Sequence, residues 1–405
     1  MTRVDQLELP YFDYTEPELR GERFHEAMLA LREQGWLAQG PLGSIVLDRD
    51  AGEHFLRTRD AVFPGIKIAE IFDVRDGPLW EEMRRNILHL NGPDHARLRK
   101  LVNPALAPRA VQRHRPAMRE LLRELFAGLP GECDFVQAIA KPYPSRAIAH
   151  VMGVPAADAP RLHHWSNWIQ RQFDAVSMAN ERPAIEDAVA ELYEYLWELL
   201  RARRLDPGED LISALIAASE PDVASLSDLE CVNLVLNVLI GGVDTTQSQL
   251  AHALRLFAEH PEQWELLAAD PDLAGAAVEE VLRFEPITPF TARILERDIL
   301  FRDITFPAGT IVMVCAFTAN RDFGDHDLGG DRFDITADRG RSRVLTFGAG
   351  VHYCLGANLA RVELEEALAF LAPRMPGLAL AGEPVFEGIT GIYGLAELPL
   401  RFGRV

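Results

Sequence analysis

The sequence predicts a mostly α-helical protein with a small β-sheet region, folded as one large domain over residues 1–405. Apolar residues recur at helical spacing from about Phe24 to the end of the chain, and no low-complexity linker or internal repeat divides it. Only a few short segments have the composition of strands. With 405 residues and 48% hydrophobic content, the chain can bury one large core.

The longest predicted helix begins at a capping box formed by Ser227 and Glu230 and continues to about His260, before Pro261. At about 1.5 Å per residue it is roughly 50 Å long. A second helix is predicted from about Pro271 to residue 284 or 285, because a residue that precedes proline disfavours helical geometry. Strands are predicted at residues 44–47, 299–301, 310–313 and 398–402, with a turn at residues 307–309.

Composition narrows the classes of function. There are 61 acidic and 41 basic residues, and the net charge of -20 disfavours nucleic acid or an anionic membrane as a partner. We expect no signal peptide and no membrane anchor, because the first residues lack an apolar segment and no run of eighteen apolar residues occurs. A soluble, cytoplasmic protein is therefore expected. The four cysteines are widely spaced and form no C-x-x-C pair, which argues against disulfides and structural zinc.

The segment with the most chemical information is residues 347–356, FGAGVHYCLG, which places Cys354 between a glycine-rich loop and the start of a helix. Gly348 and Gly350 allow a tight turn close to a flat cofactor. The first N–H groups of the helix would face the sulfur, and together with the helix dipole they favour the thiolate that a metal requires. The alternative is a buried, inert thiol, which is the more common state of a lone cysteine.

This loop, together with three further motifs, resembles the signature set of the cytochrome P-450 family over roughly residues 85 to 361. In that family a cysteine thiolate binds haem iron and favours cleavage of the O–O bond, and Cys354 is the matching position. The resemblance implies a cytochrome P-450 fold, haem b (iron protoporphyrin IX) as cofactor and O2 as co-substrate. It also implies electrons that come ultimately from NAD(P)H, through a ferredoxin or flavodoxin-type donor and its reductase.

The resemblance also assigns residues around the porphyrin. Its two propionates need cationic or hydrogen-bonding partners, because an unpaired buried carboxylate is costly. His95 and Arg99 are four residues apart on one predicted helix face, and Arg293 and His352 match two further propionate contacts. Taken singly, each could equally be a surface cation or an ordinary core histidine. The other positions expected to contact the cofactor are Phe347, Gly348, Gly356 and Gly241.

The centre of the long helix, residues 241–246 (GGVDTT), resembles the family's oxygen-binding segment. Each glycine costs about 1 kcal/mol relative to alanine in a helix, which suggests a purpose. Gly241 and Thr245 are four residues apart and share a face. By resemblance, Thr245 hydrogen-bonds bound oxygen and Asp244 relays protons toward it. The alternative is a glycine-induced bend with locally satisfied hydroxyls.

Glu280 and Arg283 match the E-x-x-R motif of the family. Arg283 lies 71 residues before Cys354. The resemblance implies that Arg332 joins them in a buried ion network behind the haem, where the loss of one partner would leave a charge unpaired.

By resemblance, an apolar pocket lies above the haem and accepts a small apolar or aromatic organic substrate. The residues expected to line it are Phe173, Ile240, Val243, Ile287, Phe290, Ile392 and Tyr393. Two basic clusters, at residues 97–115 and 339–343, would form the docking face for the electron donor, although a solvated charge run is the alternative.

The leading hypothesis is a haem-thiolate monooxygenase that inserts one atom of O2 by hydroxylation, epoxidation or oxidative dealkylation. A peroxide-driven peroxygenase is a second hypothesis, and Asp244 with Thr245 argues modestly against it because that reaction needs no proton relay. A third is a non-catalytic haem sensor or carrier, which would need the thiolate but not the relay.

Overall fold

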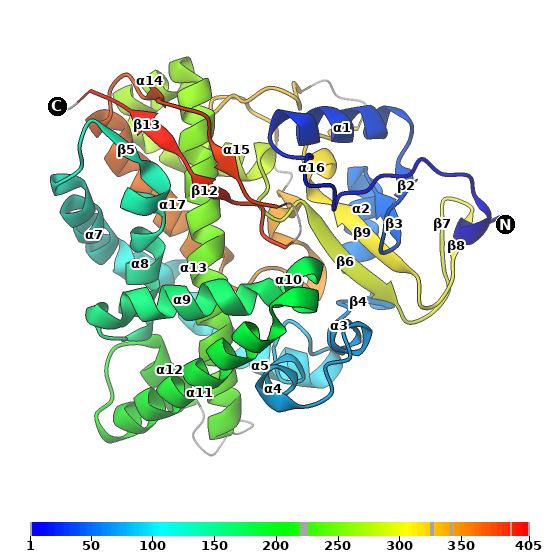
Figure 1. The fold of residues 1–405 in the computed structure, drawn as a ribbon, viewed down its shortest axis with the longest axis horizontal. Helices are drawn as coiled ribbons and strands as arrows, with labels where there is room; N and C mark the ends of the chain where they lie inside the picture. The colour runs from blue at the N-terminus through cyan, green and yellow to red at the C-terminus, as the bar shows by residue number, and fades with distance from the viewer. Residues whose placement is uncertain (1, 219–225, 325–327, 341–342, 389–390, 404–405) are drawn as a thin grey trace.

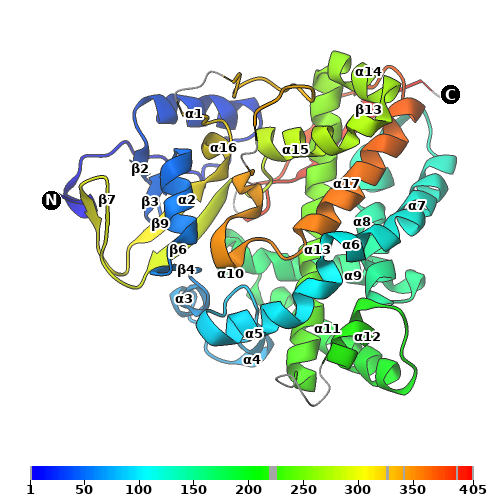
Figure 2. The ribbon, with the colours of Figure 1, turned by 180° about the vertical axis from the view of Figure 1, so that it is seen from behind.

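The computed structural model describes the chain except for residues 1, 219–225, 325–327, 341–342, 389–390 and 404–405. A large helical body lies beside a smaller region of β-sheet that carries the N-terminus (Figures 1 and 2). The helices that these residues form are α1 (Glu22–Glu33), α2 (Arg49–Arg57), α3 (Ile66–Ile71), α4 (Gly77–Met83), α5 (Gly92–Val102), α6 (Pro108–Val111), α7 (Arg115–Ala127), α8 (Pro142–Met152), α9 (Ala159–Gln170), α10 (Ala175–Asn180), α11 (Arg182–Leu205), α12 (Leu211–Ala218), α13 (Asp228–Glu259), α14 (Pro261–Ala269), α15 (Ala274–Phe284), α16 (Ala316–Ala319) and α17 (Ala357–Leu371).

Helix α13 is the central element of the helical body, and it passes through the body from one end to the other (Figure 1). The predicted capping box is present: the Ser227 side chain accepts the Glu230 N–H, and the Glu230 carboxylate accepts the Ser227 N–H. Helices α8, α9, α11, α15 and α17 pack against α13. Among the described helices, α13 alone is long and apolar enough to cross a membrane, but 67% of its most apolar window is buried inside the protein. It therefore serves as a core helix.

The strands form one five-stranded sheet and three smaller sheets. In the five-stranded sheet the order is β2-β3-β9-β6-β4, with β3 and β9 parallel and the other neighbours antiparallel. The strands of the described chain are β1 (Thr2–Arg3), β2 (Leu37–Gln39), β3 (Ser44–Val46), β4 (Ala61–Val62), β5 (Glu132–Asp134), β6 (Phe290–Leu295), β7 (Ile299–Phe301), β8 (Ile304–Phe306), β9 (Ile311–Cys315), β10 (Ala379–Leu380), β11 (Val385–Phe386), β12 (Leu395–Glu397) and β13 (Pro399–Arg401).

All four predicted strands occur, as β3, β7, β9 and β13, within two residues of the expected bounds. The predicted turn is also present between β8 and β9, where Gly309 has a φ of 83°. The predicted helix before Pro286 is α15, and it ends at Phe284 as expected. Strand β6 is the main element that the sequence analysis did not find, although it pairs with β9 over five residues.

Three hydrophobic clusters form the core: one large cluster between the helices, one around α2 and the five-stranded sheet, and one of aromatic residues beneath α1. A buried ion network joins these parts. Glu285, directly after α15, accepts from Arg255 of α13 at 2.5 Å and contacts His25 of α1 at 2.9 Å. Burial opposes ionisation of Glu285, but His25 and Arg255 outweigh it and lower the pKa of the carboxyl. The network fixes α1 and α15 against the central helix.

Candidate functional site

Cys354 lies in a loop that two glycines shape. The loop lies between the short 3-10 helix Leu345–Phe347 and α17, and Gly348 and Gly350 have φ values of 67° and 72°. These values favour glycine, as the sequence predicted. A Cβ on Gly350 would also lie 2.5 Å from the carbonyl oxygen of Leu56 in α2, so no larger residue fits there. The Cys354 N–H donates to the Phe347 carbonyl at 2.9 Å and closes the loop.

The Cys354 sulfur is accessible from one side and surrounded by protein on the others. This enclosure raises the pKa of the thiol. The backbone N–H groups of Gly356 and Ala357, with the guanidinium groups of Arg99 and Arg361, act in the opposite direction and favour the thiolate. The donors predicted at the start of the helix are therefore in place, and a cation at the sulfur would supply the remaining stabilisation.

Four basic side chains gather beside this loop. His95 and His352 have ring centroids 4.3 Å apart, and Arg99 donates to the Tyr353 carbonyl at 2.9 Å. His352 is held by Asn91, whose amide oxygen lies 2.9 Å from Nε2. Burial, together with repulsion from His95, Arg293 and Arg99, lowers the pKa of His352 to about 3. The four predicted propionate contacts are thus neighbours in space, although they come from three separate segments of the chain.

Arg293 gives the clearest indication of an anionic ligand. Its side chain is 2% exposed, and it donates only to the carbonyl of Ala292 within the described residues. Burial lowers its pKa to about 10, and no carboxylate of the described chain offsets this effect. A buried cation normally has an anionic partner, because desolvation of an unpaired charge is costly. A planar metal group with two carboxylates, whose metal faces Cys354, fits this donor set.

The centre of α13 presents open space and a hydroxyl group. Gly241 is exposed although the residues around it are mostly buried, and a Cβ at this position would meet no atom within 4 Å. Thr245 lies one turn later and donates from Oγ1 to the Gly241 carbonyl at 2.6 Å. Gly242 is different, because its Cβ would lie 2.8 Å from Cδ1 of Ile148. Gly241 therefore leaves room for a ligand, and Gly242 leaves room for α8.

Asp244 is buried where α9 packs on α13. Ser166 donates from Oγ to Oδ2 of Asp244 at 2.5 Å, and the Asn167 amide lies 3.5 Å from Oδ1. Burial raises the pKa of Asp244, and the hydrogen bond from Ser166 and the electrostatic effect of His163 oppose this increase. A carboxyl with a raised pKa can hold and release a proton nearer to neutral pH. Ser166, Asn167 and His163 were not found by the sequence analysis, because no local pattern marks them.

The structure divides the residues predicted to line the pocket into two groups. Phe173 and Ile392 are half-buried, and Ile240 and Ile287 keep slight exposure. Val243 and Tyr393 are fully enclosed by core side chains, which corrects the expectation that they line the pocket. Val243 faces away from Gly241 around the helix, and the Tyr393 hydroxyl accepts the Gly21 N–H at 2.6 Å. The ring of Phe290 packs on Tyr14, with centroids 4.9 Å apart, and so contributes to the aromatic core.

The ion network of the E-x-x-R motif forms with a different third member. Arg283 makes two hydrogen bonds with the Glu280 carboxylate, at 2.7 and 2.9 Å, and both side chains are buried. The expectation that the Arg332 side chain joins them is wrong: it is 76% exposed and pairs with Asp334. Arg332 contributes its backbone carbonyl instead, and Arg339 donates to Glu280 at 2.7 Å with a side chain that is 9% exposed. The loop turns the Arg332 side chain outward and brings Arg339 inward.

Known proteins share this arrangement. A family model described as cytochrome P-450 matches residues 164–371. The luteothin monooxygenase of Streptomyces thioluteus is 35% identical over 410 residues, which cover 99% of this chain and 98% of that enzyme. The chain belongs to the cytochrome P-450 family. The vitamin D(3) 25-hydroxylase of Pseudonocardia autotrophica is 37% identical over 320 residues, or 78% of this cytochrome P-450 and 77% of the hydroxylase.

A crystal structure of CalO2 has the same fold, with a TM-score of 0.89 and 32% sequence identity over 98% of this chain and 100% of CalO2. The predicted fold class and family are therefore confirmed. This cytochrome P-450 is a monooxygenase that uses haem iron, O2 and electrons from a redox partner.

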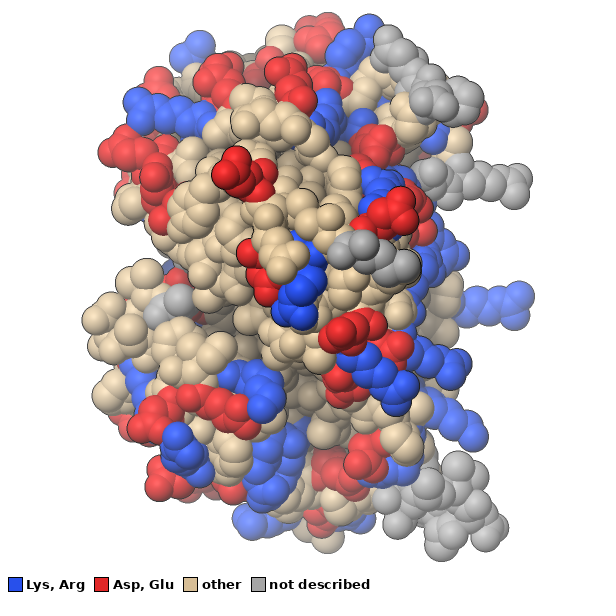
Figure 3. All heavy atoms as spheres, turned by 90° about the vertical axis from the view of Figure 1, so that its right-hand side faces the viewer, with Lys and Arg blue, Asp and Glu red and all other residues tan. Residues whose placement is uncertain are grey.

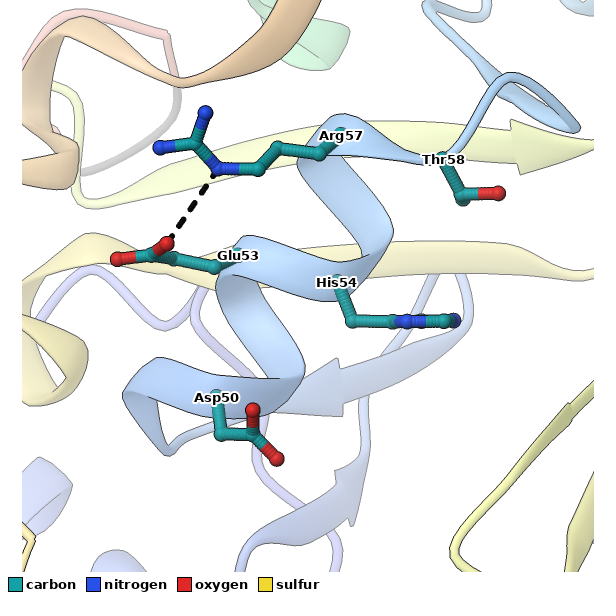
Figure 4. A pocket seen from close by; sticks show the side chains of 5 residues that line it. All are labelled: Asp50, Glu53, His54, Arg57 and Thr58. Atoms are coloured by element: carbon teal, nitrogen blue, oxygen red, sulfur yellow. Dashed lines mark hydrogen bonds and ion pairs between the residues drawn. The ribbon is translucent and has the colours of Figure 1, made fainter.

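One surface pocket of this cytochrome P-450 is lined mainly by charged side chains. It has a volume of about 400 Å³ and lies on α2, where it is lined by Asp50, Glu53, His54, Arg57 and Thr58. In Figure 4, Glu53 and Arg57 point toward one another, and their Oε2 and Nε atoms are 3.3 Å apart. The charged lining does not suit an apolar substrate. Helix α2 supports the cysteine loop by its backbone, where the Leu56 carbonyl lies against Gly350.

The two adjacent glycines of α13 give a matched test of the site. Gly241→Ala adds a methyl group in open space, so we expect the free energy of unfolding to rise by about 0.5–1 kcal/mol through helix propensity. The same methyl group reduces the space available to a ligand, so the affinity of the holoenzyme for a bulky imidazole should fall. Gly242→Ala should lower the free energy of unfolding by about 1 kcal/mol, because Ile148 must move. Urea titration measures the free energy of unfolding, and titration of the Soret band measures the affinity for the imidazole. Equal free energies of unfolding and equal affinities in the two variants would contradict this account.

A second matched pair tests the corrected ion network. Arg339→Met removes one of the two cations that contact buried Glu280, so it should lower the free energy of unfolding by about 2 kcal/mol. Arg332→Met changes an exposed side chain and keeps the backbone carbonyl, so its effect should stay within about 0.5 kcal/mol. Denaturant unfolding of the two holoproteins measures the difference. If Arg332→Met lowered the free energy of unfolding more than Arg339→Met, the original expectation that the Arg332 side chain joins Glu280 and Arg283 would be correct.

Proposed function

We propose that this cytochrome P-450 binds haem b through Cys354 and inserts one atom of O2 into a small apolar or aromatic organic molecule. The observation that carries the proposal is the position of Arg293, a buried guanidinium with no carboxylate partner among the described residues. It acts on His352, which lies two residues before the accessible Cys354. Cys354 would hold the iron. Arg99, Arg293, His95 and His352 would hold the two propionates.

Bound haem supplies the activation of O2 when two electrons and two protons reach it. The chain's own residues then provide the proton and the confined space. Thr245 already donates its hydroxyl hydrogen to the Gly241 carbonyl, which leaves the oxygen lone pairs free to accept a further hydrogen bond. Asp244 is the adjacent acid, and Ser166 holds its carboxyl in place. We assign Asp244 the delivery of protons and Thr245 their orientation.

The substrate is inferred from the predicted pocket residues that keep some exposure. Ile240, Ile287, Phe173 and Ile392 are apolar, and such a surface favours a ligand with little charge. Relatives named as a monooxygenase and as hydroxylases support insertion of oxygen, by hydroxylation, epoxidation or oxidative dealkylation.

The electron donor is inferred from charge. Of the basic residues near the cysteine loop, several are paired within the protein: Arg97 with Glu230, Arg115 with Glu365 and Glu366, and Arg339 with Glu280. Among the described residues of the two predicted clusters, the exposed basic residues that remain are Lys100, Arg109, Arg113 and Arg343, and Arg341 lies outside the described residues. Helix α6, which carries Arg109, packs on α17, the helix that follows Cys354 (Figure 2). In Figure 3, basic side chains project along the right-hand edge of the face that is seen.

An acidic ferredoxin or flavodoxin-type protein complements this surface. We propose that such a donor brings electrons from NAD(P)H through its reductase, and that the protein works in the cytoplasm. The protein as a whole is acidic, with a net charge of -20, so these exposed basic residues differ from the rest of its surface.

The test begins with the holoenzyme and a ligand identified by its shift of the Soret band, from a set of apolar, aromatic and highly charged compounds. With that ligand, Thr245→Ala should lower the product formed per electron pair about 10-fold or more and release hydrogen peroxide, with ligand affinity unchanged. Thr245→Ser keeps the hydroxyl and should retain most of the coupling.

Three outcomes would contradict the proposal. Binding of highly charged compounds alone would exclude an apolar substrate. Absence of product from the wild type with every bound ligand would favour a haem sensor or carrier. Equal product formation from hydrogen peroxide without any electron donor would favour a peroxygenase.

A further inference from the structure

Helices α8 and α9 both pack on α13 (Figure 1), and residues of both helices line a surface cleft. Its volume is about 540 Å³, and the residues that line it include Lys141, Ser145, Pro160, His163, His164 and Asn167. This polar cleft lies outside the set of residues assigned to the haem and to the substrate. It brings solvent to the outer side of α9.

Two residues of this cleft also reach the surroundings of Asp244. Asn167 lines the cleft and contacts Oδ1 of Asp244 at 3.5 Å. His163 lies three residues before Ser166 on α9, and its Nε2 lies 3.0 Å from Oε1 of Gln247, three residues after Asp244 on α13. One face of α9 therefore meets one face of α13, with solvent on the outer side of His163 and buried Asp244 on the inner side.

The contact with Gln247 determines where the histidine ring can accept a proton. Because the amide oxygen of Gln247 accepts, the neutral ring carries its hydrogen on Nε2. Nδ1 is then an acceptor, and it makes no hydrogen bond with the residues that the structure describes. A half-buried imidazole with a free acceptor at a solvent-filled cleft can take up a proton.

The charged groups around His163 change its pKa in opposite directions, so the ring can both take up and release a proton. Burial lowers the pKa of His163, and Lys141 and His164 lower it further, whereas Asp244 raises it. Glu387 also interacts electrostatically with Asp244, and Arg171, Arg20 and Lys141 in turn interact with Glu387. The pKa of His163 is below its ordinary value, so the ring is neutral at neutral pH and, once protonated, gives the proton up readily.

We infer that His163 takes protons from water in the cleft between α8 and α9 and passes them to Asp244. In each transfer the neutral imidazole gains one proton from solvent and gives one proton to the Asp244 carboxylate, after which the ring is neutral again. Only N–H and O–H bonds change, and no oxidant or reductant is needed. The inference rests on the proposed function, because it supplies the protons that Asp244 delivers. His163 contacts neither the haem nor the substrate, so it is a relay residue behind Asp244.

The first test compares two histidines of the same cleft. His163→Gln keeps a donor for Gln247 but cannot titrate, and His164→Gln changes the exposed neighbour. With O2 and saturating electron donor, His163→Gln should slow turnover several-fold and increase the solvent deuterium isotope effect, whereas His164→Gln should behave as the wild type. Turnover driven by hydrogen peroxide should be unchanged in both, since peroxide brings its own protons. Wild-type rates and isotope effect in His163→Gln, with an unchanged Soret spectrum, would overturn the inference.

The second test does not depend on turnover. In the reduced, carbon-monoxide-bound holoprotein, NMR titration of the histidine ring signals should show a lower pKa for His163 in Asp244→Asn than in the wild type, because the carboxylate that raises this pKa is gone. The His164 signal should not move. An unchanged His163 pKa in Asp244→Asn would show that the two groups do not interact and would overturn the inference.

The same variants separate this inference from the proposed function. Slow turnover in Asp244→Asn together with wild-type turnover in His163→Gln would overturn the role of His163 alone. Wild-type turnover and coupling in Asp244→Asn would overturn the relay on which both depend.

Discussion

Cys354 and Arg293 lie far apart in the sequence but in the same region of the protein, and each has an interaction that the described chain does not complete. The thiol is enclosed on all sides but one, and the guanidinium is buried without a carboxylate. Keeping such groups in place costs free energy that packing elsewhere must supply. A bound group with a cationic metal at its centre and carboxylates at its edge would satisfy both the Cys354 sulfur and the Arg293 guanidinium. The cysteine loop, the cluster of basic residues and the open face of α13 all follow from that requirement.

The protein fixes this region through backbone contacts more than through side chains. Gly350 lies against the Leu56 carbonyl, and the Phe347 carbonyl holds the N–H of Cys354. On the other side, the hydroxyl of Thr245 bonds to the carbonyl of Gly241. Such contacts leave little freedom for the loop or the helix to shift. The ion pair of Glu280 with Arg283 and Arg339 adds a rigid support in the segment that leads to the loop.

Much of this arrangement was predictable because it depends on local signals. The glycines of residues 347–356, the capping box at Ser227 and the spacing of Glu280 and Arg283 are each visible within a few residues. Arg332 and Arg339 could not be distinguished in this way, since the path of a long loop decides which side chain turns inward. Strand β6 was missed because its pairing with β9 is long-range. His163 was missed for the same reason, since its relation to Asp244 exists only where α9 crosses α13.

The two faces of α13 have different roles: one packs in the core and the other borders the functional site. Val243 is fully buried against the core, whereas Gly241 and Thr245 border open space. Asp244 lies between these faces and contacts α9, so a proton can reach it without passing through the apolar side.

The most direct measurement of the central claim is the absorption spectrum of the reduced, carbon-monoxide-bound protein, for the wild type and for Cys354→Ser. The account predicts a Soret band at the long wavelength typical of thiolate-bound haem in the wild type, and its loss in Cys354→Ser. A wild-type protein that takes up no haem, or a Cys354→Ser protein with an unchanged spectrum, would contradict it.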